Sequence, residues 1–230
     1  MKIQRYPQAS STAKKLILFF NGWGTPCAVV EHLVIPEDYD LIICYDYHQL
    51  NIHIDLAQYE QINVVAWSMG VWVANQYCQA LQDKIISAVA INGTGLSMHD
   101  DYGIAKATFV GTLAYLDELN LAKFNRRMCG SKEILNAYQQ FEHRSIDNVK
   151  NELNFLYQQL SADSTEPQKI KTLQWNKAII ATQDRIFTAE NQGRYWQNYN
   201  QQQTNPCKIE QLDTGHYPFL SWQAWEQIWQ

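Results

Sequence analysis

Three polar residues suited to nucleophilic catalysis stand far apart in this sequence, each close behind a short apolar run. Ser68 lies in Val-Val-Ala-Trp-Ser-Met-Gly-Val-Trp, where a strand-like run leads directly into a helix-like one. Sharp strand-to-helix turns of the form Gly-x-Ser-x-Gly expose a nucleophilic serine. Here Ala66 replaces the first glycine and Gly70 keeps the second. Because this turn needs small residues two positions before and after the serine, we predict that Ser68 is a nucleophile.

A nucleophilic serine needs a base, and the base needs an acid that orients it. When the three follow in the order serine, acid, histidine, the histidine lies after the last strand. Of the 6 histidines, only His216 has this place. Asp184, just beyond the apolar run that ends at Ala181, is the predicted acid. Asp213 is the competing candidate, but it lies so near His216 in sequence that a triad geometry would be awkward.

A glycine-rich turn, Asn-Gly-Trp-Gly, follows the first strong apolar run at positions 21–24. An oxyanion hole of this type combines the N–H after the nucleophile with an N–H from the loop after an earlier strand. We therefore predict that the backbone N–H groups of Met69 and Trp23 form the oxyanion hole. Taken alone, the motif would be only a turn; its place upstream of Ser68 gives it weight.

Six short apolar runs bounded by Gly, Asn or Pro predict six buried strands. They lie at 15–20, 41–45, 62–66, 85–91, 178–181 and 207–212. Helical patterning between several of them, as at 71–81 and 190–199, predicts an α/β fold with a mostly parallel sheet. From about 97 to 172 the patches at 105–121, 131–141 and 147–160 are all helical. We therefore predict one domain, 1–230, with a helical lid insertion at roughly 97–172.

Composition argues against several classes of function. The net charge of -5 argues weakly against nonspecific nucleic-acid binding. No apolar stretch approaches the ~18 residues of a membrane span, and the polar N-terminal region lacks a signal-peptide core. Five scattered cysteines without a Cys-x-x-Cys pair favour a reduced, cytoplasmic location. No cluster of histidines and carboxylates predicts a metal, and no cofactor is expected.

The chain also resembles the pimeloyl-acyl-carrier-protein methyl ester esterases of the BioG type, which act in biotin synthesis and have an α/β-hydrolase fold. The resemblance spans nearly the whole chain in order, and Ala66 matches the short elbow of that family. The segments that carry it are F-F-N-G-W-G-T-P at 19–26, L-I-I-C-Y-D-Y at 41–47, V-A-W-S-M-G-V-W-V-A at 65–74, I-N-G-T-G-L at 91–96, G-T-L at 111–113, R-R-M-C-G at 126–130, D-R-I-F-T at 184–188, N-Q at 191–192 and G-H-Y at 215–217.

The resemblance implies that Ser68 is the nucleophile, His216 the base and Asp184 the acid, with Trp23 in the oxyanion loop. It implies removal of a methyl group from a pimeloyl chain carried by an acyl carrier protein, through an acyl-enzyme. Two alternatives stay open: another serine hydrolase, such as an acyl-carrier thioesterase or a broad short-chain carboxylesterase, and a non-catalytic binding protein on the same scaffold.

The predicted insertion contains residues suited to such a partner. Four cations fall within ten residues with no acid between them: Lys123, Arg126, Arg127 and Lys132. A basic patch of this kind would attract and orient an acidic carrier protein, although each cation could equally belong to a solvated helix face. Apolar residues of the insertion could cover the acyl chain, but we expect most of them only to pack it onto the body. They are Phe109, Leu113, Leu116, Phe124, Phe141, Phe155 and Leu156.

Overall fold

The computed structural model describes residues 1–7, 13–50, 54–162 and 172–230, and its centre is a seven-stranded sheet in the order β1-β3-β2-β4-β5-β6-β7. All neighbouring pairs are parallel except β1 and β3, which are antiparallel. The predicted α/β class with a mostly parallel sheet is therefore confirmed. The strands are β1 (Lys2–Tyr6), β2 (Lys15–Phe20), β3 (Tyr39–Tyr45), β4 (Gln61–Trp67), β5 (Ile85–Ile91), β6 (Lys177–Ala181) and β7 (Lys208–Leu212).

The seventh strand, β1, is the one that the sequence pattern missed. Its residues, Lys-Ile-Gln-Arg-Tyr, are exposed or only half-buried, because it pairs at the edge of the sheet with β3 alone. An edge strand needs no continuous apolar run, and charged residues on it discourage pairing with other chains. Five of the six predicted strands are largely buried, whereas the sixth, β7, is the other edge strand and is exposed or half-buried.

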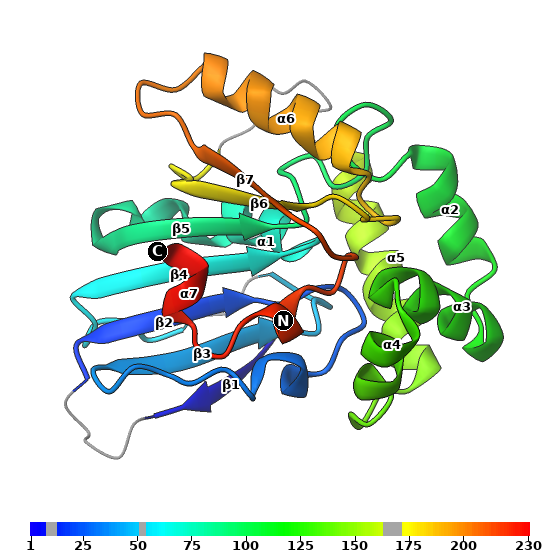
Figure 1. Cartoon of the computed structure of the whole chain (residues 1–230), viewed down its shortest axis with the longest axis horizontal. Coiled ribbons are helices and arrows are strands. Elements are labelled where there is room, and N and C mark those ends of the chain that lie inside the picture. Colours follow the sequence, from blue (N-terminus) through cyan, green and yellow to red (C-terminus); the bar gives the residue numbers. More distant parts are fainter. Residues whose placement is uncertain (8–12, 51–53, 163–171) are drawn as a thin grey trace.

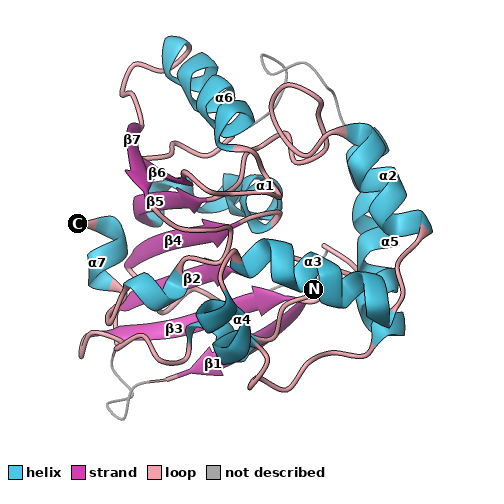
Figure 2. Cartoon of the chain, turned by 45° about the vertical axis from the view of Figure 1, so that its right-hand side comes forward, coloured by secondary structure: helices cyan, strands magenta, loops and turns pink. Residues whose placement is uncertain are grey.

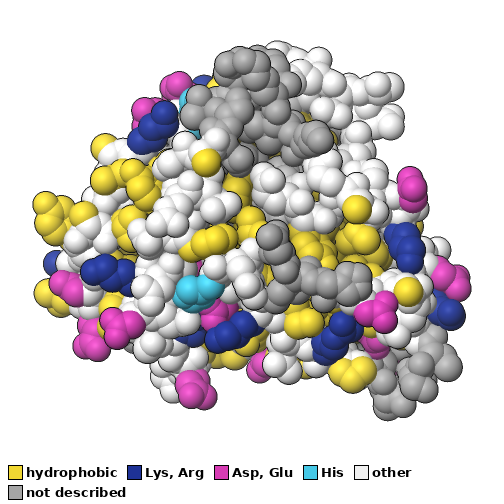
Figure 3. All heavy atoms as spheres, turned by 180° about the vertical axis from the view of Figure 1, so that it is seen from behind, with side chains coloured by type: hydrophobic (Ala, Val, Ile, Leu, Met, Phe, Trp, Pro, Cys, Tyr) yellow, Lys and Arg dark blue, Asp and Glu magenta, His cyan; other side chains and the backbone are white. Residues whose placement is uncertain are grey.

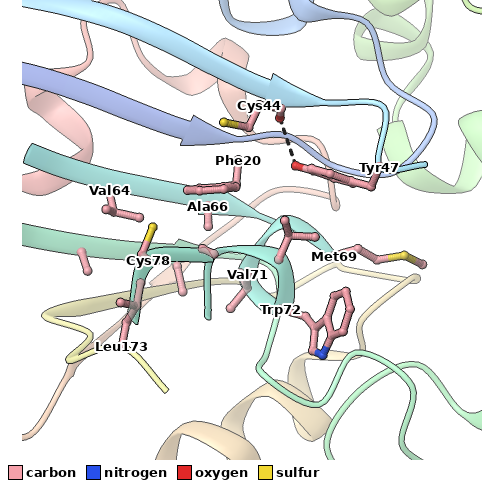
Figure 4. Packing of buried hydrophobic residues seen from close by; sticks show 14 of the residues in the cluster. Phe20, Cys44, Tyr47, Val64, Ala66, Met69, Val71, Trp72, Cys78 and Leu173 are labelled. Atoms are coloured by element: carbon pink, nitrogen blue, oxygen red, sulfur yellow. Dashed lines mark hydrogen bonds between the residues drawn. The ribbon is translucent and has the colours of Figure 1, made fainter. Parts of the chain in front are cut away.

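The sheet has an apolar core on each face, because side chains along a strand point alternately to opposite sides. In β2, Leu18 and Phe20 belong to one core and Phe19 to the other. The first core includes α1 (Gly70–Tyr77) and α6 (Ala189–Gln201), and the second includes α7 (Glu226–Trp229). Figure 1 shows α1 behind the sheet and α7 in front of it. Figure 4 shows part of the first core, where residues of β2 and β4 meet α1.

The connection from β5 to β6 carries four helices: α2 (Lys106–Ala114), α3 (Glu118–Cys129), α4 (Lys132–Tyr138) and α5 (Ile146–Ala162). They gather beyond the carboxyl ends of the central strands (Figures 1 and 2). The helical patch predicted at 105–121 is in fact divided, because Asp117 caps α3 by accepting a hydrogen bond of 2.7 Å from the Asn120 N–H. Positions 163–171 of the predicted insertion lie outside the described residues.

Three 3₁₀ segments complete the described structure, at Cys27–Val30, Cys78–Lys84 and Phe219–Ser221. The second of them forms the last part of the helix predicted at 71–81, which tightens after Tyr77. Over the described ranges, no helix combines the length and the apolar character that crossing a bilayer requires.

Candidate active site

Ser68 occupies a sharp turn between β4 and α1. Its φ of +60° lies in the left-handed region, which a residue other than glycine rarely adopts and which marks local strain. Backbone hydrogen bonds hold the turn on both sides: the Ser68 N–H donates to the Ile91 carbonyl at 2.9 Å, and the Ser68 carbonyl accepts from the Val71 N–H at 3.1 Å. The strain is therefore kept in place by β5 and by the first turn of α1.

The two small positions of this turn have different surroundings. A Cβ on Gly70 would lie 2.2 Å from the Phe20 carbonyl oxygen, so no side chain fits there. The methyl group of Ala66, in contrast, is fully buried in the core between β2 and α1, where Figure 4 places it beside Phe20. Only the second position of the motif is closed to a side chain, and alanine at the first is an ordinary core residue.

The structure brings the three predicted triad residues together. His216 Nε2 lies 2.9 Å from Ser68 Oγ, and His216 Nδ1 lies 2.7 Å from Asp184 Oδ2. The relative exposure of the three residues is 6% for Ser68, 2% for His216 and 6% for Asp184, so all three are shielded from water. Asp213 lies apart from it, with an exposed carboxylate that accepts hydrogen bonds from Thr182 and Gln183.

The carboxylate of Asp184 is fixed by several donors. Its Oδ1 accepts from the backbone N–H groups of Ile186 at 2.7 Å and Phe187 at 3.0 Å, and the side chain of Gln192 donates to Oδ2 at 3.1 Å. The ring of Phe187 also stacks on the His216 imidazole, with centroids 5.9 Å apart and planes 5° from parallel. Asp184 therefore presents one oxygen to His216 in a set orientation.

The backbone of His216 is tied to two strands that precede it. Its carbonyl accepts from the Trp67 indole N–H and from the Asn92 amide group, each at 2.9 Å. Asn92 directly follows β5 with a φ of +46°, and its amide oxygen accepts from the Ala181 N–H at 2.7 Å. The ends of β4, β5 and β6 thus fix where the imidazole stands.

The two predicted oxyanion donors flank the same pocket. Met69 follows Ser68 directly, and Trp23 lies in the loop after β2; both line the pocket beside Ser68. Within the part of the chain that the structure describes, neither backbone N–H donates a hydrogen bond. Both groups are therefore available to a ligand atom.

The pocket is lined by apolar residues of both the insertion and the body, together with Thr108, Thr112, Arg127 and Arg185. A second, more open hollow shares Thr108, Thr112, Phe124 and Arg127 with it and extends toward Lys123. Of the apolar residues considered for covering an acyl chain, Phe109 and Phe124 line the inner pocket and Leu116 lines the outer hollow. The two hollows adjoin and form a passage from the insertion to Met69, the residue after Ser68.

The four predicted cations are divided between two places. Lys123 and Arg127 line the outer hollow, with the Arg127 guanidinium 6.0 Å from the centre of the Phe124 ring. Arg126 and Lys132 line a separate groove between α3 and α4. Among the described residues drawn in Figure 3, on the face seen from behind, lysine and arginine lie interspersed with aspartate and glutamate. Of the four predicted cations, Lys123 and Arg127 are thus the two that line the passage, whereas Arg126 and Lys132 line the separate groove.

A family model described as "Pimeloyl-ACP methyl esterase BioG" matches residues 1–228. The chain belongs to the BioG family. The crystal structure of BioG from Haemophilus influenzae shares 40% sequence identity with it, covers 100% of both chains and superimposes with a TM-score of 0.90. An uncharacterized protein of the same organism is 42% identical over 214 residues, which are 93% of this chain and 94% of that protein.

Other relatives of this BioG chain are longer or more distant. A malonyl-[acyl-carrier protein] O-methyltransferase from Bacteroides fragilis is 41% identical over 207 residues, which are 89% of this chain but only 40% of that protein. A lipase-esterase related protein from Clostridium acetobutylicum has a TM-score of 0.64 at 15% identity, covers 94% of this chain and 93% of its own, and shows the fold alone. The fold is that of the α/β-hydrolases, and the family indicates an esterase-type hydrolase.

The sequence pattern did not predict the residues that hold Ser68, His216 and Asp184 in place. Asn92 had a usable signal, because asparagine before a glycine at a strand end is suited to a positive φ. Gln192 had none from its own type, since it is one of several glutamines in a polar helix and only the fold shows that it is fully buried. The indole of Trp67 was hidden within an apolar run.

Proposed function

We propose that this chain hydrolyses the methyl ester of a pimeloyl group carried by an acyl carrier protein, as a step of biotin synthesis. The observation that carries the proposal is the hydrogen-bonded series Ser68–His216–Asp184 beside an apolar pocket in a chain of the BioG family. All five cysteines are free thiols, which favours a reducing compartment and supports action in the cytoplasm.

In the first half of the proposed reaction, His216 Nε2 takes the proton of Ser68 Oγ while that oxygen attacks the ester carbonyl carbon. Asp184 accepts the hydrogen bond from Nδ1–H, so the imidazole keeps its acceptor nitrogen toward the serine and the imidazolium is stabilised. The carbonyl oxygen becomes an oxyanion that accepts from the N–H groups of Trp23 and Met69. The C–O bond to the methoxy group then breaks, and His216 donates its proton to form methanol.

The second half regenerates the enzyme. A water molecule loses a proton to His216 and attacks the acyl carbon of the Ser68 ester, again through an oxyanion held by the same two N–H groups. The bond from carbon to Ser68 Oγ breaks and the serine recovers the proton. The product is a free carboxylate at the distal end of the pimeloyl chain, with the bond to the carrier untouched.

The lining of the passage suits the polarity of this substrate. The apolar inner pocket would hold the methylene chain next to Ser68, and the outer hollow would receive the carrier end. Lys123 and Arg127 stand at that outer hollow, so they are the cations that an acidic carrier would meet first. The groove with Arg126 and Lys132 would contact the carrier less closely.

The decisive experiment is incubation with authentic pimeloyl-carrier-protein methyl ester, followed by intact-protein mass spectrometry of the carrier. We expect the mass to fall by the difference between a methyl group and a hydrogen atom. Loss of the whole acyl group, with the methyl ester intact, would instead identify an acyl-carrier thioesterase. Fast turnover of many short esters but none of the carrier-bound one would identify a broad carboxylesterase.

Two further measurements test the role of Ser68. A serine-reactive phosphonate should label Ser68, and Ser68→Ala should lower kcat by about 10⁶, the loss typical of removing a triad nucleophile. A folded protein that neither reacts with the phosphonate nor turns over any ester would be a binding protein on this scaffold. An unchanged rate in Ser68→Ala would remove Ser68 from the mechanism.

The carrier contact can be tested with a matched pair of charge reversals on α3. Lys123→Glu should raise KM for the carrier-bound substrate by about tenfold while sparing a small chromogenic ester, because steering acts on the charged partner. Arg126→Glu makes the same change in charge on the same helix, away from the passage, and should have a smaller effect. Equal effects of both variants on both substrates would indicate a folding defect.

A further inference from the structure

The loop that carries the Trp23 N–H is held by the insertion as well as by the body of the protein. The Gly22 carbonyl, which belongs to the same peptide unit as the Trp23 N–H, accepts from Thr25 Oγ1 at 2.8 Å. The next N–H along the chain, that of Gly24, donates to Glu152 Oε2 on α5 at 3.0 Å. Both peptide units that adjoin the Trp23 Cα are thus fixed, one by a local side chain and one by a residue far away in sequence.

Glu152 joins this loop to the loop that follows β3. Its Oε1 accepts from the Tyr47 N–H at 2.8 Å, and the Tyr47 hydroxyl donates to the Asn21 carbonyl at 2.7 Å. The same hydroxyl lies 3.0 Å from the Cys44 carbonyl, the contact drawn as a dashed line in Figure 4. α5 adds a second tie, because the Val149 carbonyl accepts from the Trp23 indole N–H at 2.9 Å.

A charged side chain such as that of Glu152 is unusual at a fully buried position of a helix. Its side chain is fully buried, and burial raises the pKa of its carboxyl, with the Arg144 guanidinium 2.8 Å away opposing the shift. A buried ion pair rarely stabilises a fold more than apolar residues of the same volume would. A carboxylate, however, only accepts hydrogen bonds, so it can satisfy two backbone N–H groups and a guanidinium together.

We propose that Glu152 is a positioning residue for the reaction, which aims the Trp23 N–H at the developing oxyanion by holding the Gly24 N–H. This inference rests on the proposed function, because it takes the Trp23 N–H as an oxyanion donor. It also makes α5 a fixed part of the catalytic scaffold.

The test is Glu152→Gln, with Asp147→Asn on the exposed first turn of the same helix as a control for removing one acid. Glutamine keeps one acceptor oxygen but places an NH₂ group against a backbone donor or Arg144. We expect kcat for a chromogenic short ester to fall by about 10- to 100-fold, less than the 10²–10³ typical of losing an oxyanion donor outright. KM should stay within about threefold, because ground-state contacts are kept.

A tetrahedral mimic separates positioning from general destabilisation. Ser68 Oγ adds to the carbonyl carbon of a trifluoromethyl ketone and its proton passes to His216. The ketone oxygen then becomes an oxyanion in the predicted oxyanion hole. Its affinity should fall in Glu152→Gln by the same factor as kcat/KM, while the affinity for the carboxylate product changes little. A variant with a lower Tm but unchanged kcat and unchanged ketone affinity would show that Glu152 is merely structural, and would overturn the inference.

Hydrogen exchange on the wild-type protein keeps the inference testable if the variant does not fold. The Gly24 N–H should exchange as slowly as the amides of β2, because its acceptor is fully buried; exchange within seconds would refute the tie to Glu152. Failure of the proposed function looks different: the wild-type protein would then leave the carrier-bound methyl ester uncleaved, or Ser68→Ala would remain active. If Ser68→Ala is inactive while Glu152→Gln keeps the wild-type kcat, only the role given to Glu152 is wrong.

Discussion

Substitutions at the two small residues of the serine turn should affect different properties: kcat at Gly70 and the free energy of unfolding at Ala66. In Gly70→Ala, the new Cβ would meet the Phe20 carbonyl oxygen at 2.2 Å and the Asn21 carbonyl oxygen at 2.7 Å. Both are backbone atoms at the end of β2, where no flexible side chain can yield. Relief requires the turn or the end of β2 to move by about 1 Å, since ordinary carbon–oxygen contacts lie near 3.3 Å or beyond.

Such a movement acts directly on catalysis, because Phe20 and Asn21 lead into the loop that carries the Trp23 N–H. The distance between that N–H and Ser68 would change by roughly the amount that separates a good hydrogen bond from none. We therefore expect Gly70→Ala to lower kcat by about 10²–10³, the loss measured when one oxyanion donor is removed.

The reciprocal variant, Ala66→Gly, restores the full Gly-x-Ser-x-Gly pattern. It removes a fully buried methyl group, worth about 1 kcal/mol of apolar burial, and adds about 0.5–1 kcal/mol of backbone entropy cost for glycine inside a strand. We expect the free energy of unfolding to fall by about 1.5–2 kcal/mol, with kcat within threefold of the wild type.

Both variants can be assayed with a chromogenic short ester for kcat and with urea unfolding for stability, after the number of active sites has been titrated with a phosphonate. The titration removes inactive protein from the comparison. If Gly70→Ala keeps kcat within threefold, the close contact with β2 does not govern the site. If Ala66→Gly raises kcat tenfold, alanine at this position is a catalytic defect and the reasoning about the turn is wrong.

Three further predictions concern residues that support the site or the fold around it. Asn92→Asp keeps the acceptor for Ala181 but loses the donor to the His216 carbonyl, so kcat should fall about fivefold at constant KM, in line with one hydrogen bond of about 1 kcal/mol. Gln192→Leu removes a donor to Asp184 and should lower kcat by a similar factor, with phosphonate labelling slowed in proportion. Asp46→Asn should cost about 1.5–3 kcal/mol of unfolding free energy at neutral pH, because it removes one of the two carboxylates that contact the Arg144 guanidinium and also the ion pair with Lys2. Burial opposes ionisation of Asp46, but hydrogen bonding to Lys2 and the nearby Arg144 leave its pKa lowered from 3.8. The ionised form therefore contributes stability above that value, and the gap between wild type and Asp46→Asn in pH-dependent urea unfolding should narrow as the pH falls below it; a gap that widens in acid would contradict the assignment.

The proximity of Ser68, His216 and Asp184 could be predicted because it obeys a rule of parallel sheets. The carboxyl ends of parallel strands meet at one edge, so residues that follow β4, β6 and β7 come together however far apart they lie in sequence. Ser68, Asp184 and His216 each follow one of these strands, which the apolar runs located within two residues. What the runs could not locate was β1, since an edge strand with one partner needs no apolar signature.

The cations of the insertion show why closeness in sequence does not predict closeness on a surface. Arg126 and Arg127 are adjacent, but neighbouring positions on a helix point about 100° apart and do not face each other. Arg127 accordingly lines the passage toward Ser68, while Arg126 faces the groove shared with α4. A count of charges within a window predicted a patch, and helical geometry divided it between two sites.

The sequence pattern can predict that Glu152 is buried but not which groups it contacts. The sequence of α5 places it among Val149, Leu153, Leu156 and Leu160, at the three- and four-residue spacing of a buried stripe. A charge on such a stripe can be recognised without a structure, and its burial implies a partner. The partners themselves, Arg144 on the approach to α5 and the Gly24 N–H at the site, depend on how the insertion closes over the sheet. An ionised group is costly to bury. A charge on the apolar stripe of a helix that covers an active site is therefore a specific candidate for a positioning residue. The two backbone N–H groups that donate hydrogen bonds to Glu152 indicate which loops it positions.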